Sequence, residues 1–318
     1  MEFTVRKTTE LTNIEQRDIL ALFNNIFGRN RTLEQFRNQF LNNPWGYSYH
    51  SMMIDNEQIV GCISYIPACY LLKGKRHNFA LVVDAMVGEL YRGFINFYRM
   101  IIVINNYLRK ENFDACLCFP NDSAYPIYIK SKLMKDVGDL DTYCLPYRIG
   151  GIKQKLKIFN WFSIAFVRCY VSFTALFASK STHHFSIEKE AGTYNVTRYK
   201  RLDGNYTIAE YQGSRFAYKL MKYEGVRSAF LIDVFKKSSA NFNKAIRYII
   251  KHHHKEFDIL LYVGHLPFRG HGLIQVPRKF APKEFHFTGE ILRKDEIDKD
   301  LFFNLDNWDV NLSNYDLL

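Results

Sequence analysis

The residues that could carry out chemistry gather in two loops of one stretch, Leu81 to Leu133. This stretch reads as an apolar strand, a turn holding Tyr91, Arg92 and Gly93, a helix, a second strand, and a helix that opens at Asn121. In such a β-α-β-α unit both loops lie at the same end of the sheet, which is where open α/β sheets bind ligands. The two loops are therefore the predicted binding site.

The elements around these loops predict a mixed α/β domain over residues 1–150. Their order is two helices, an antiparallel ribbon, the β-α-β-α unit and a closing strand. The helices are expected at 14–27 and 33–41, the ribbon at 47–54 and 58–72, and the closing strand near 141–147. This arrangement places the two loops at one end of a single sheet.

A second domain is expected over residues 185–318, since 318 residues exceed the size of one growing core. It repeats the order of the first: Phe257-Asp258 corresponds to Phe113-Asp114, an offset of 258 − 114 = 144 residues. Its elements are expected as strands at 194–199, 206–211, 229–235 and 257–263, with a helix at 241–255. The repeated order of elements predicts two tandem domains. Because the second half lacks both loop motifs, we expect the second domain to be degenerate.

Residues 151–184 are expected to form an apolar helical linker. Its core, 156–178, approaches the length of a membrane span, but Asn160 and Arg168 interrupt it, and a central arginine is costly in lipid. Helices packed between domains or against a partner are therefore favoured over membrane contact.

Composition excludes several classes of protein. The net charge of +11 is spread over separate clusters that read as solvated loops, and no nucleic-acid-binding motif is present. The six cysteines show no metal-ligand spacing, so no metal site is expected. A reducing compartment and the charged start MEFTVRKTTE predict a cytoplasmic protein, while the oligomeric state stays open.

The second loop resembles a known signature. Asn121, Ala124, Tyr128 and Lys130 are in register with the N-x-x-A-x-x-x-Y-x-K-x-G-F motif of the GNAT acyltransferase superfamily, although Lys132 replaces its glycine. The first loop, from Val87 through Tyr91, Arg92 and Gly93, resembles the V-x-P-x-Y-R-G run of the same family. The runs FPN at 119–121 and SKLMKDVG at 131–138, followed by Leu145-Pro146, resemble the subgroup found beside bacterial surface-polysaccharide genes.

This resemblance implies two tandem GNAT-like domains and an N-acyltransferase that moves an acyl group, in the first instance acetyl, from CoA to a small-molecule amine such as an amino sugar. It implies that Tyr128 protonates the departing thiolate as general acid. Asp84 is the first candidate for the base and Glu89 the second. The residues expected around acetyl-CoA or another acyl-CoA are Met86, Val87, Tyr91, Arg92, Gly93, Phe94, Ile95, Asn96, Phe97 and Asn121.

Two other functions remain open. Ile95 and Phe97 stand where the family has glycines next to the phosphates, so the chain could be an inactive binding or scaffold protein that keeps the fold. A Fem-type aminoacyl transferase, which is also built from two such domains, would instead use aminoacyl-tRNA. The sequence therefore leaves these three functions as alternatives.

Overall fold

The computed structural model describes residues 1–202, 204–281 and 283–315. It is a mixed α/β protein with two sheets, each belonging to a separate compact unit. Unit 1 comprises Met1–Asp139, Ser186–Gly204 and Phe285–Trp308, and unit 2 comprises Leu140–Phe185, Asn205–Glu284 and Asp309–Leu318.

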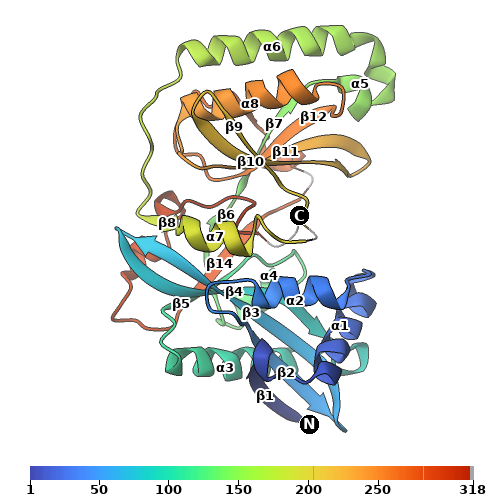
Figure 1. The fold of residues 1–318 in the computed structure, drawn as a ribbon, viewed down its shortest axis with the longest axis vertical. Coiled ribbons are helices and arrows are strands. Elements are labelled where there is room, and N and C mark those ends of the chain that lie inside the picture. Colours follow the sequence, from blue (N-terminus) through green and yellow to red (C-terminus); the bar gives the residue numbers. More distant parts are fainter. Residues whose placement is uncertain (203, 282, 316–318) are drawn as a thin grey trace. The chain divides into compact units, whose positions relative to one another are not determined.

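The sheet of unit 1 is antiparallel except for one parallel pair, β4 with β5 (Figure 1). The short strand β8 adds to the outer part of β3. In spatial order the main strands are β1 (Glu2–Lys7), β2 (Tyr49–Asp55), β3 (Gln58–Leu72), β4 (Lys75–Val87), β5 (Ala115–Cys118), β14 (His286–Ile291) and β6 (Lys135–Asp139), and β8 is Ile187–Lys189.

Helices cover both faces of this sheet (Figure 1). The helix α3 (Phe94–Lys110) packs Met100, Ile101 and Ile104 onto one face, while α1 (Asn13–Phe27) and α2 (Leu33–Leu41) cover the other. Both α1 and α2 begin with a capping box, from Thr12 and Thr32 respectively, which satisfies backbone donors of the first turn. The shorter helices of this unit are α4 (Tyr125–Lys130), α7 (Ala191–Thr197) and α9 (Lys299–Phe302).

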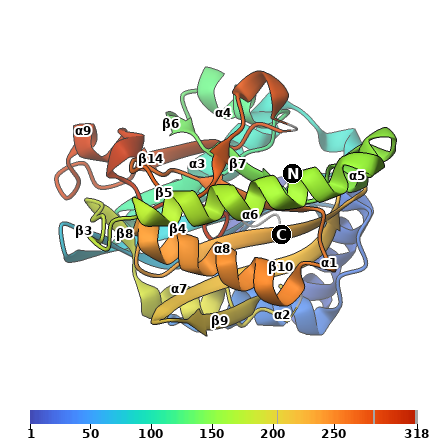
Figure 2. The same ribbon diagram turned by 90° about the horizontal axis from the view of Figure 1, so that it is seen from above.

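The sheet of unit 2 repeats this plan on a smaller scale. Its parallel pair is β11 (Val226–Val234) with β12 (Ile259–Gly264), joined by α8 (Ser239–His253). The remaining strands are β9 (Thr207–Tyr211), β10 (Ser214–Tyr223), β7 (Asp141–Pro146) and β13 (Ile274–Gln275). The helix α8 packs on the sheet, and α6 (Asn160–Leu176), which follows α5 (Ile149–Ile152), lies along α8 (Figures 1 and 2).

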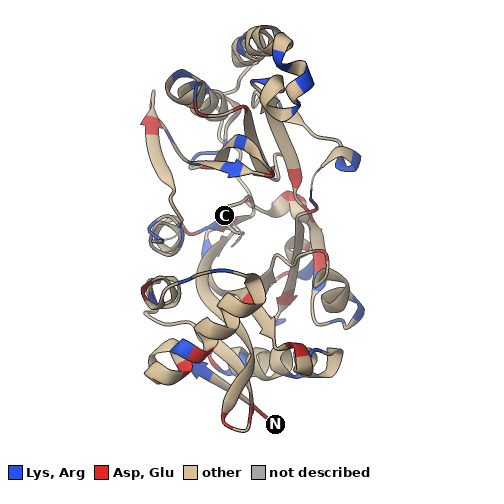
Figure 3. Cartoon of the chain, turned by 90° about the vertical axis from the view of Figure 1, so that its right-hand side faces the viewer, with Lys and Arg blue, Asp and Glu red and all other residues tan. Residues whose placement is uncertain are grey.

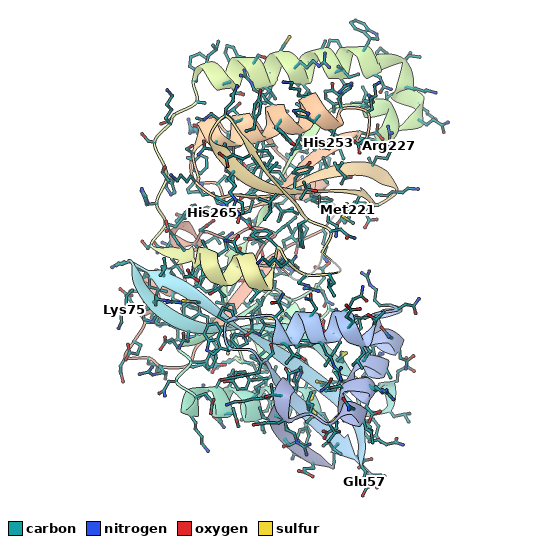
Figure 4. All side chains as sticks on the ribbon, viewed as in Figure 1. Glu57, Lys75, Met221, Arg227, His253 and His265 are labelled. Atoms are coloured by element: carbon teal, nitrogen blue, oxygen red, sulfur yellow. The ribbon has the colours of Figure 1, made fainter. Side chains whose placement is uncertain are left out.

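The expected internal repeat is present in the structure. Both β4-α3-β5 and β11-α8-β12 are parallel β-α-β units, and Phe113 and Phe257 are each buried in their own core. The aspartates that follow them are held structurally: Arg227, labelled in Figure 4, binds Asp258 at 2.6 Å, and Arg293 binds Asp114 at 3.2 Å. The two units therefore share an aspartate–arginine ion pair at corresponding positions as well as their topology.

The two units are not consecutive in sequence, unlike the expected division at 1–150, 151–184 and 185–318. The strand β7 pairs with β12 and β13 in unit 2, although it was expected to close the first domain. Conversely, β14 pairs with β5 and β6 in unit 1. Each half of the chain thus supplies a strand to the other sheet. Periodicity identifies a strand but not its hydrogen-bonding partner, because partners are chosen by long-range pairing.

One expected strand is a helix. Residues 194–199 were read as extended because tyrosine, valine and threonine favour strands. The structure instead has α7 there, with the Glu190 side chain accepting hydrogen bonds from the backbone N–H groups of Gly192 and Thr193. This cap, together with burial of Tyr194, outweighs the intrinsic strand preference.

Unit 2 contains a buried ionic cluster. Lys237, which is 5% exposed, binds Asp233 and lies 3.3 Å from Asp309, and Asn311 donates to Asp233 at 2.8 Å. Burial lowers the pKa of Lys237, but the negative charges of Asp233 and Asp309 outweigh this effect and raise it. The lysine therefore stays charged inside the core.

We expect Lys237→Ala to destabilise the protein by about 3–5 kcal/mol, because two buried carboxylates would lose their cation. Urea unfolding of the full chain measures the change. The neighbouring Lys236 is exposed, so Lys236→Ala is a matched control that should change stability by less than about 0.5 kcal/mol. Equal effects of the two substitutions would contradict a structural role for the cluster.

Candidate active site

The strands β4 and β5 pair only over part of their length. Their parallel ladder runs from Phe79 opposite Ala115 to Val82 opposite Cys118. Beyond this point β4 continues to Val87, while the chain after β5 turns away toward α4. The two strands therefore separate at the end of the sheet where both predicted loops lie.

A β-bulge lies just past this separation. The register of β3 and β4 shifts between Cys62 opposite Met86 and Ser64 opposite Val83, so β4 carries one extra residue there. Asp84 in the bulge has φ 48°, a left-handed conformation that is uncommon for a residue other than glycine. Bulges of this kind redirect side chains and backbone groups next to functional sites.

The N-terminus of α3 lies beside the first loop and is open to an anion. Gly93 is the N-cap, no side chain caps the helix, and the first turn holds no acidic residue. The first backbone N–H groups of a helix, together with its dipole, attract negative charge. The N-terminus of α3, at the position predicted for the cofactor, therefore has no side-chain cap and no acidic residue in its first turn.

The residues predicted around the cofactor occupy several different environments. Tyr91 donates to Asp55 at 2.9 Å, and the Asn96 amide donates to the Tyr91 carbonyl at 2.9 Å, so both stabilise the turn. Arg92 is exposed and lies 3.8 Å from Glu89. Met86 is buried beneath α1 and α2, and Val87 is half-buried on the α3 face.

The two residues that replace glycines point to different places. Ile95 is 64% exposed, and the neighbouring Phe94 is 53% exposed. Phe97 turns inward and packs its ring against Tyr128, with centroids 5.3 Å apart and planes at 73°. An anion approaching the N-terminus of α3 would therefore meet Phe94 and Ile95, while the Phe97 ring belongs to the core.

Tyr128 is buried at the point where β4 and β5 separate. It is 1% exposed and packs in the same core cluster as Cys118, the last β5 residue paired with β4, and its hydroxyl has no hydrogen-bond partner among the described residues. Burial raises the pKa of Tyr128 well above 10 and that of Cys118 to about 12. Both groups are therefore neutral at ordinary pH, and the phenol keeps its proton available for donation.

Asp84 is engaged rather than solvated. Arg31, from the loop between α1 and α2, donates to its carboxylate at 2.6 Å, and both side chains are about nine-tenths buried. The Arg31 guanidinium also lies 3.5 Å from the ring centre of Phe23. The strained bulge and the arginine thus fix the carboxylate on the face of the sheet that α1 and α2 cover.

The two remaining predicted residues lie at the surface. The Glu89 side chain is 84% exposed in a short turn before α3. The Asn121 side chain accepts from the Ala124 N–H at 2.9 Å and from the Ser123 hydroxyl at 2.8 Å. Asn121 therefore stabilises the turn that leads into α4.

His286 is a candidate that the sequence did not indicate. It lies on β14 and is buried; its Nδ1 is 2.8 Å from Asp139, and its Nε2 faces Asp122 at 3.6 Å. Its ring stacks on Tyr125, one turn before Tyr128 on α4, with centroids 3.8 Å apart. The pairing of β14 with β5 and β6 brings this histidine to the site, and nothing in the local sequence signals that pairing.

The described ranges contain no group of three or more His, Cys, Asp or Glu residues suited to a metal ion. The consecutive histidines 252–254 at the end of α8 do not converge. His253, labelled in Figure 4, instead lies 2.8 Å from the Tyr218 hydroxyl and 2.8 Å from Glu256.

Comparison with solved structures identifies the fold. A conserved protein from Enterococcus faecalis, described as a probable N-acyltransferase, aligns over 92% of this chain and 73% of its own, with a TM-score of 0.58 and 12% identity. A GCN5-related N-acetyltransferase from Anabaena variabilis aligns over 92% and 73%, with a TM-score of 0.59 and 11% identity. One from Kribbella flavida aligns over 92% and 72%, with a TM-score of 0.57 and 11% identity.

The chain therefore has the fold of the GCN5-related N-acetyltransferases, in a form consistent with two tandem domains. No protein-family model matches the sequence. No curated protein matches it either. At identities near one in ten the likeness establishes the fold, and activity must be argued from the site.

The Arg31 and Asp84 pair can be tested by a double-mutant cycle. We expect Arg31→Ala to cost about 1–3 kcal/mol, because it leaves a nearly buried carboxylate without its guanidinium. Combined with Asp84→Asn, the two changes should be non-additive by about 0.5–3 kcal/mol in urea unfolding. Arg29→Ala, at an exposed position of the same loop, is the control. Additive effects would show that the pair does not fix Asp84.

Proposed function

We propose that this protein is an N-acyltransferase that uses acyl-CoA, in the first instance acetyl-CoA, to acylate a small-molecule amine. The observation that carries the proposal is the burial of Tyr128 at the end of the β4–β5 ladder, with a hydroxyl that has no hydrogen-bond partner among the described residues. A bulged strand, an uncapped helix N-terminus and a buried phenol meet at one end of one sheet. This combination suits a thioester donor with an anionic tail.

The residues of the chain would divide the work as follows. The N–H groups at the start of α3 would hold the pyrophosphate, supported by the exposed Arg92. The stretch of β4 beyond Val82 would line the acyl-bearing arm. Bound acyl-CoA supplies the activated thioester. Tyr128 would donate its proton to the departing sulfur, which suits a phenol kept neutral by burial.

The amine proton needs an acceptor, and three residues are candidates. Glu89 is solvated and would act through water. Asp84 is already paired with Arg31, so it would have to leave or share that ion pair. His286 is oriented by Asp139 in the way a carboxylate orients a general base. We propose His286 as the base, with Asp84 as the alternative.

The acceptor that we propose is an amino sugar carried on a nucleotide or a lipid, in line with the resemblance to proteins encoded beside surface-polysaccharide genes. Thiol release from acetyl-CoA, measured with a panel of amino sugars, polyamines and aminoglycosides, tests this choice. A clear preference for a non-sugar amine would overturn the acceptor while leaving acyl transfer intact.

An inactive scaffold is the competing function, and Phe94 and Ile95 at the mouth of the anion site favour it. Isothermal titration with acetyl-CoA separates the two functions. Saturable binding that competes with CoA supports the transferase. Absence of binding at millimolar acetyl-CoA would reject it in favour of the scaffold.

We expect Tyr128→Phe to lower kcat by roughly 100-fold or more, the usual contribution of a general acid, with little change in KM for acetyl-CoA. Tyr65→Phe removes another buried hydroxyl from the same core and should retain activity. Because burial raises the pKa of Tyr128 well above 10, the wild-type rate should show no alkaline fall below pH 10. Equal losses from both substitutions would argue against a specific role for Tyr128.

Single substitutions distinguish the bases. If His286 takes the proton, His286→Gln should lower kcat/KM by roughly 100-fold or more, the usual contribution of a general base. Asp84→Asn should then lower kcat/KM by much less. The opposite pattern, a large loss only in Asp84→Asn, would assign the proton to Asp84.

A further inference from the structure

One helix of unit 2 carries an apolar face that the unit does not cover. The face of α6 formed by Ser163, Val167 and Val171 is buried, and α6 packs along α8. The opposite face is a continuous stripe at helical spacing, and Figure 4 shows side chains projecting outward from this helix. The exposed residues of the stripe are Phe162, Phe166, Cys169, Phe173 and Leu176, with Trp161 at its edge and Phe177 beyond its end.

The size of this face is unusual for a protein surface. Trp161 is 71% exposed, Phe173 60% and Leu176 79%. Contiguous exposed patches of large apolar residues mark surfaces that bind proteins or membranes. Across the described part of the chain, Gln154–Leu176 is also the segment long and apolar enough to cross a bilayer.

All charged side chains in the sequence segment that contains the stripe have the same sign. From residue 149 to residue 187 the sequence contains no aspartate or glutamate, and Figure 3 shows no acidic position on α6. The five cations of this range are Lys153, Lys155, Lys157, Arg168 and Lys180. Lys155 and Lys157 lie in the turn Gln154–Phe159 just before α6, and Lys153 directly precedes that turn. A tryptophan flanked by lysines beside a phenylalanine face matches the chemistry of a lipid interface.

The geometry favours lying on a membrane over crossing it. The segment Gln154–Leu176 is long enough to cross a bilayer core of about 30 Å, but one face of α6 is already used by the protein. The inner face of α6 contributes Val167 and Val171 to the core of unit 2, so insertion across the bilayer would remove both from that core. One face is thus committed to the protein, and the other is free to enter a headgroup layer.

We infer that α6 and the turn before it dock this protein onto a membrane surface rich in anionic lipid. A second copy of the chain is the other possible occupant of the stripe. Two copies would bring the same five cations together with no acidic partner in either segment, so charge opposes that pairing. Anionic headgroups complement the lysines, while the aromatic residues enter the acyl boundary. This inference is independent of acyl transfer.

Vesicle co-sedimentation with the full-length protein tests the inference. We expect binding to vesicles of 30% phosphatidylglycerol in phosphatidylcholine to exceed binding to pure phosphatidylcholine by roughly tenfold or more, and to weaken as salt is raised. Alkylation of Cys169, which is exposed within the stripe, should be slow on anionic vesicles and fast in solution. Lys153→Gln, Lys155→Gln and Lys157→Gln together should remove the lipid preference.

The decisive variant is Phe166→Asp with Phe173→Asp, which should lower vesicle binding at least tenfold. Phe280→Asp, at another position of unit 2 that is 69% exposed, is the matched control and should bind normally. Circular dichroism and urea unfolding confirm that each variant is folded. Equal vesicle binding by the double variant and the control would overturn the inference. So would a dimer in analytical ultracentrifugation that the double variant abolishes, since the stripe would then pair two copies.

Discussion

The pairing of β14 with β5 is the constraint on which the rest of unit 1 depends. The strand β5 has only four residues, all buried, and its hydrogen bonds are shared between β4 on one side and β14 on the other. This pairing holds Cys118 in the core cluster that contains Tyr128, and together with the pairing to β6 it brings His286 to the same end of the sheet. The catalytic geometry that we propose is therefore built by a strand that lies far along the chain.

The local architecture of the site could be predicted from the sequence. The β-α-β-α unit, its two loops and the helix opening near Asn121 follow from patterns of a few residues, and the structure confirms these elements. The exchange of β7 and β14 could not be predicted, because the sequence of a strand does not show which other strand it pairs with. The helix α7 was missed because capping by Glu190 and tertiary burial outweighed strand propensity.

The polar contacts of the site were the least predictable part. Asp84 could be placed on its strand, but its bulge and its ion pair with Arg31 depend on backbone register and on a loop 53 residues away. His286 had no local signal at all. Those contacts decide which group could accept a proton, so the sequence predicts the fold but does not identify the base.

The two units share their polar architecture as well as their topology. In β11 the register shift next to Asp233 corresponds to the bulge of β4 at Asp84, and each aspartate is held by a cation, Lys237 in one case and Arg31 in the other. In unit 2 that carboxylate is sealed in the core. Unit 2 therefore has the same combination of a bulged strand and an aspartate paired with a cation, here as part of its core.

The exchange of β7 and β14 also limits how this protein could have changed during evolution. A duplicated chain usually allows one copy to be deleted, shuffled or transferred to another gene. Here neither half encodes a complete sheet, so a break between the halves would separate β7 from β12 and β14 from β5. Neither half could therefore be removed or transferred without taking a strand away from the other sheet.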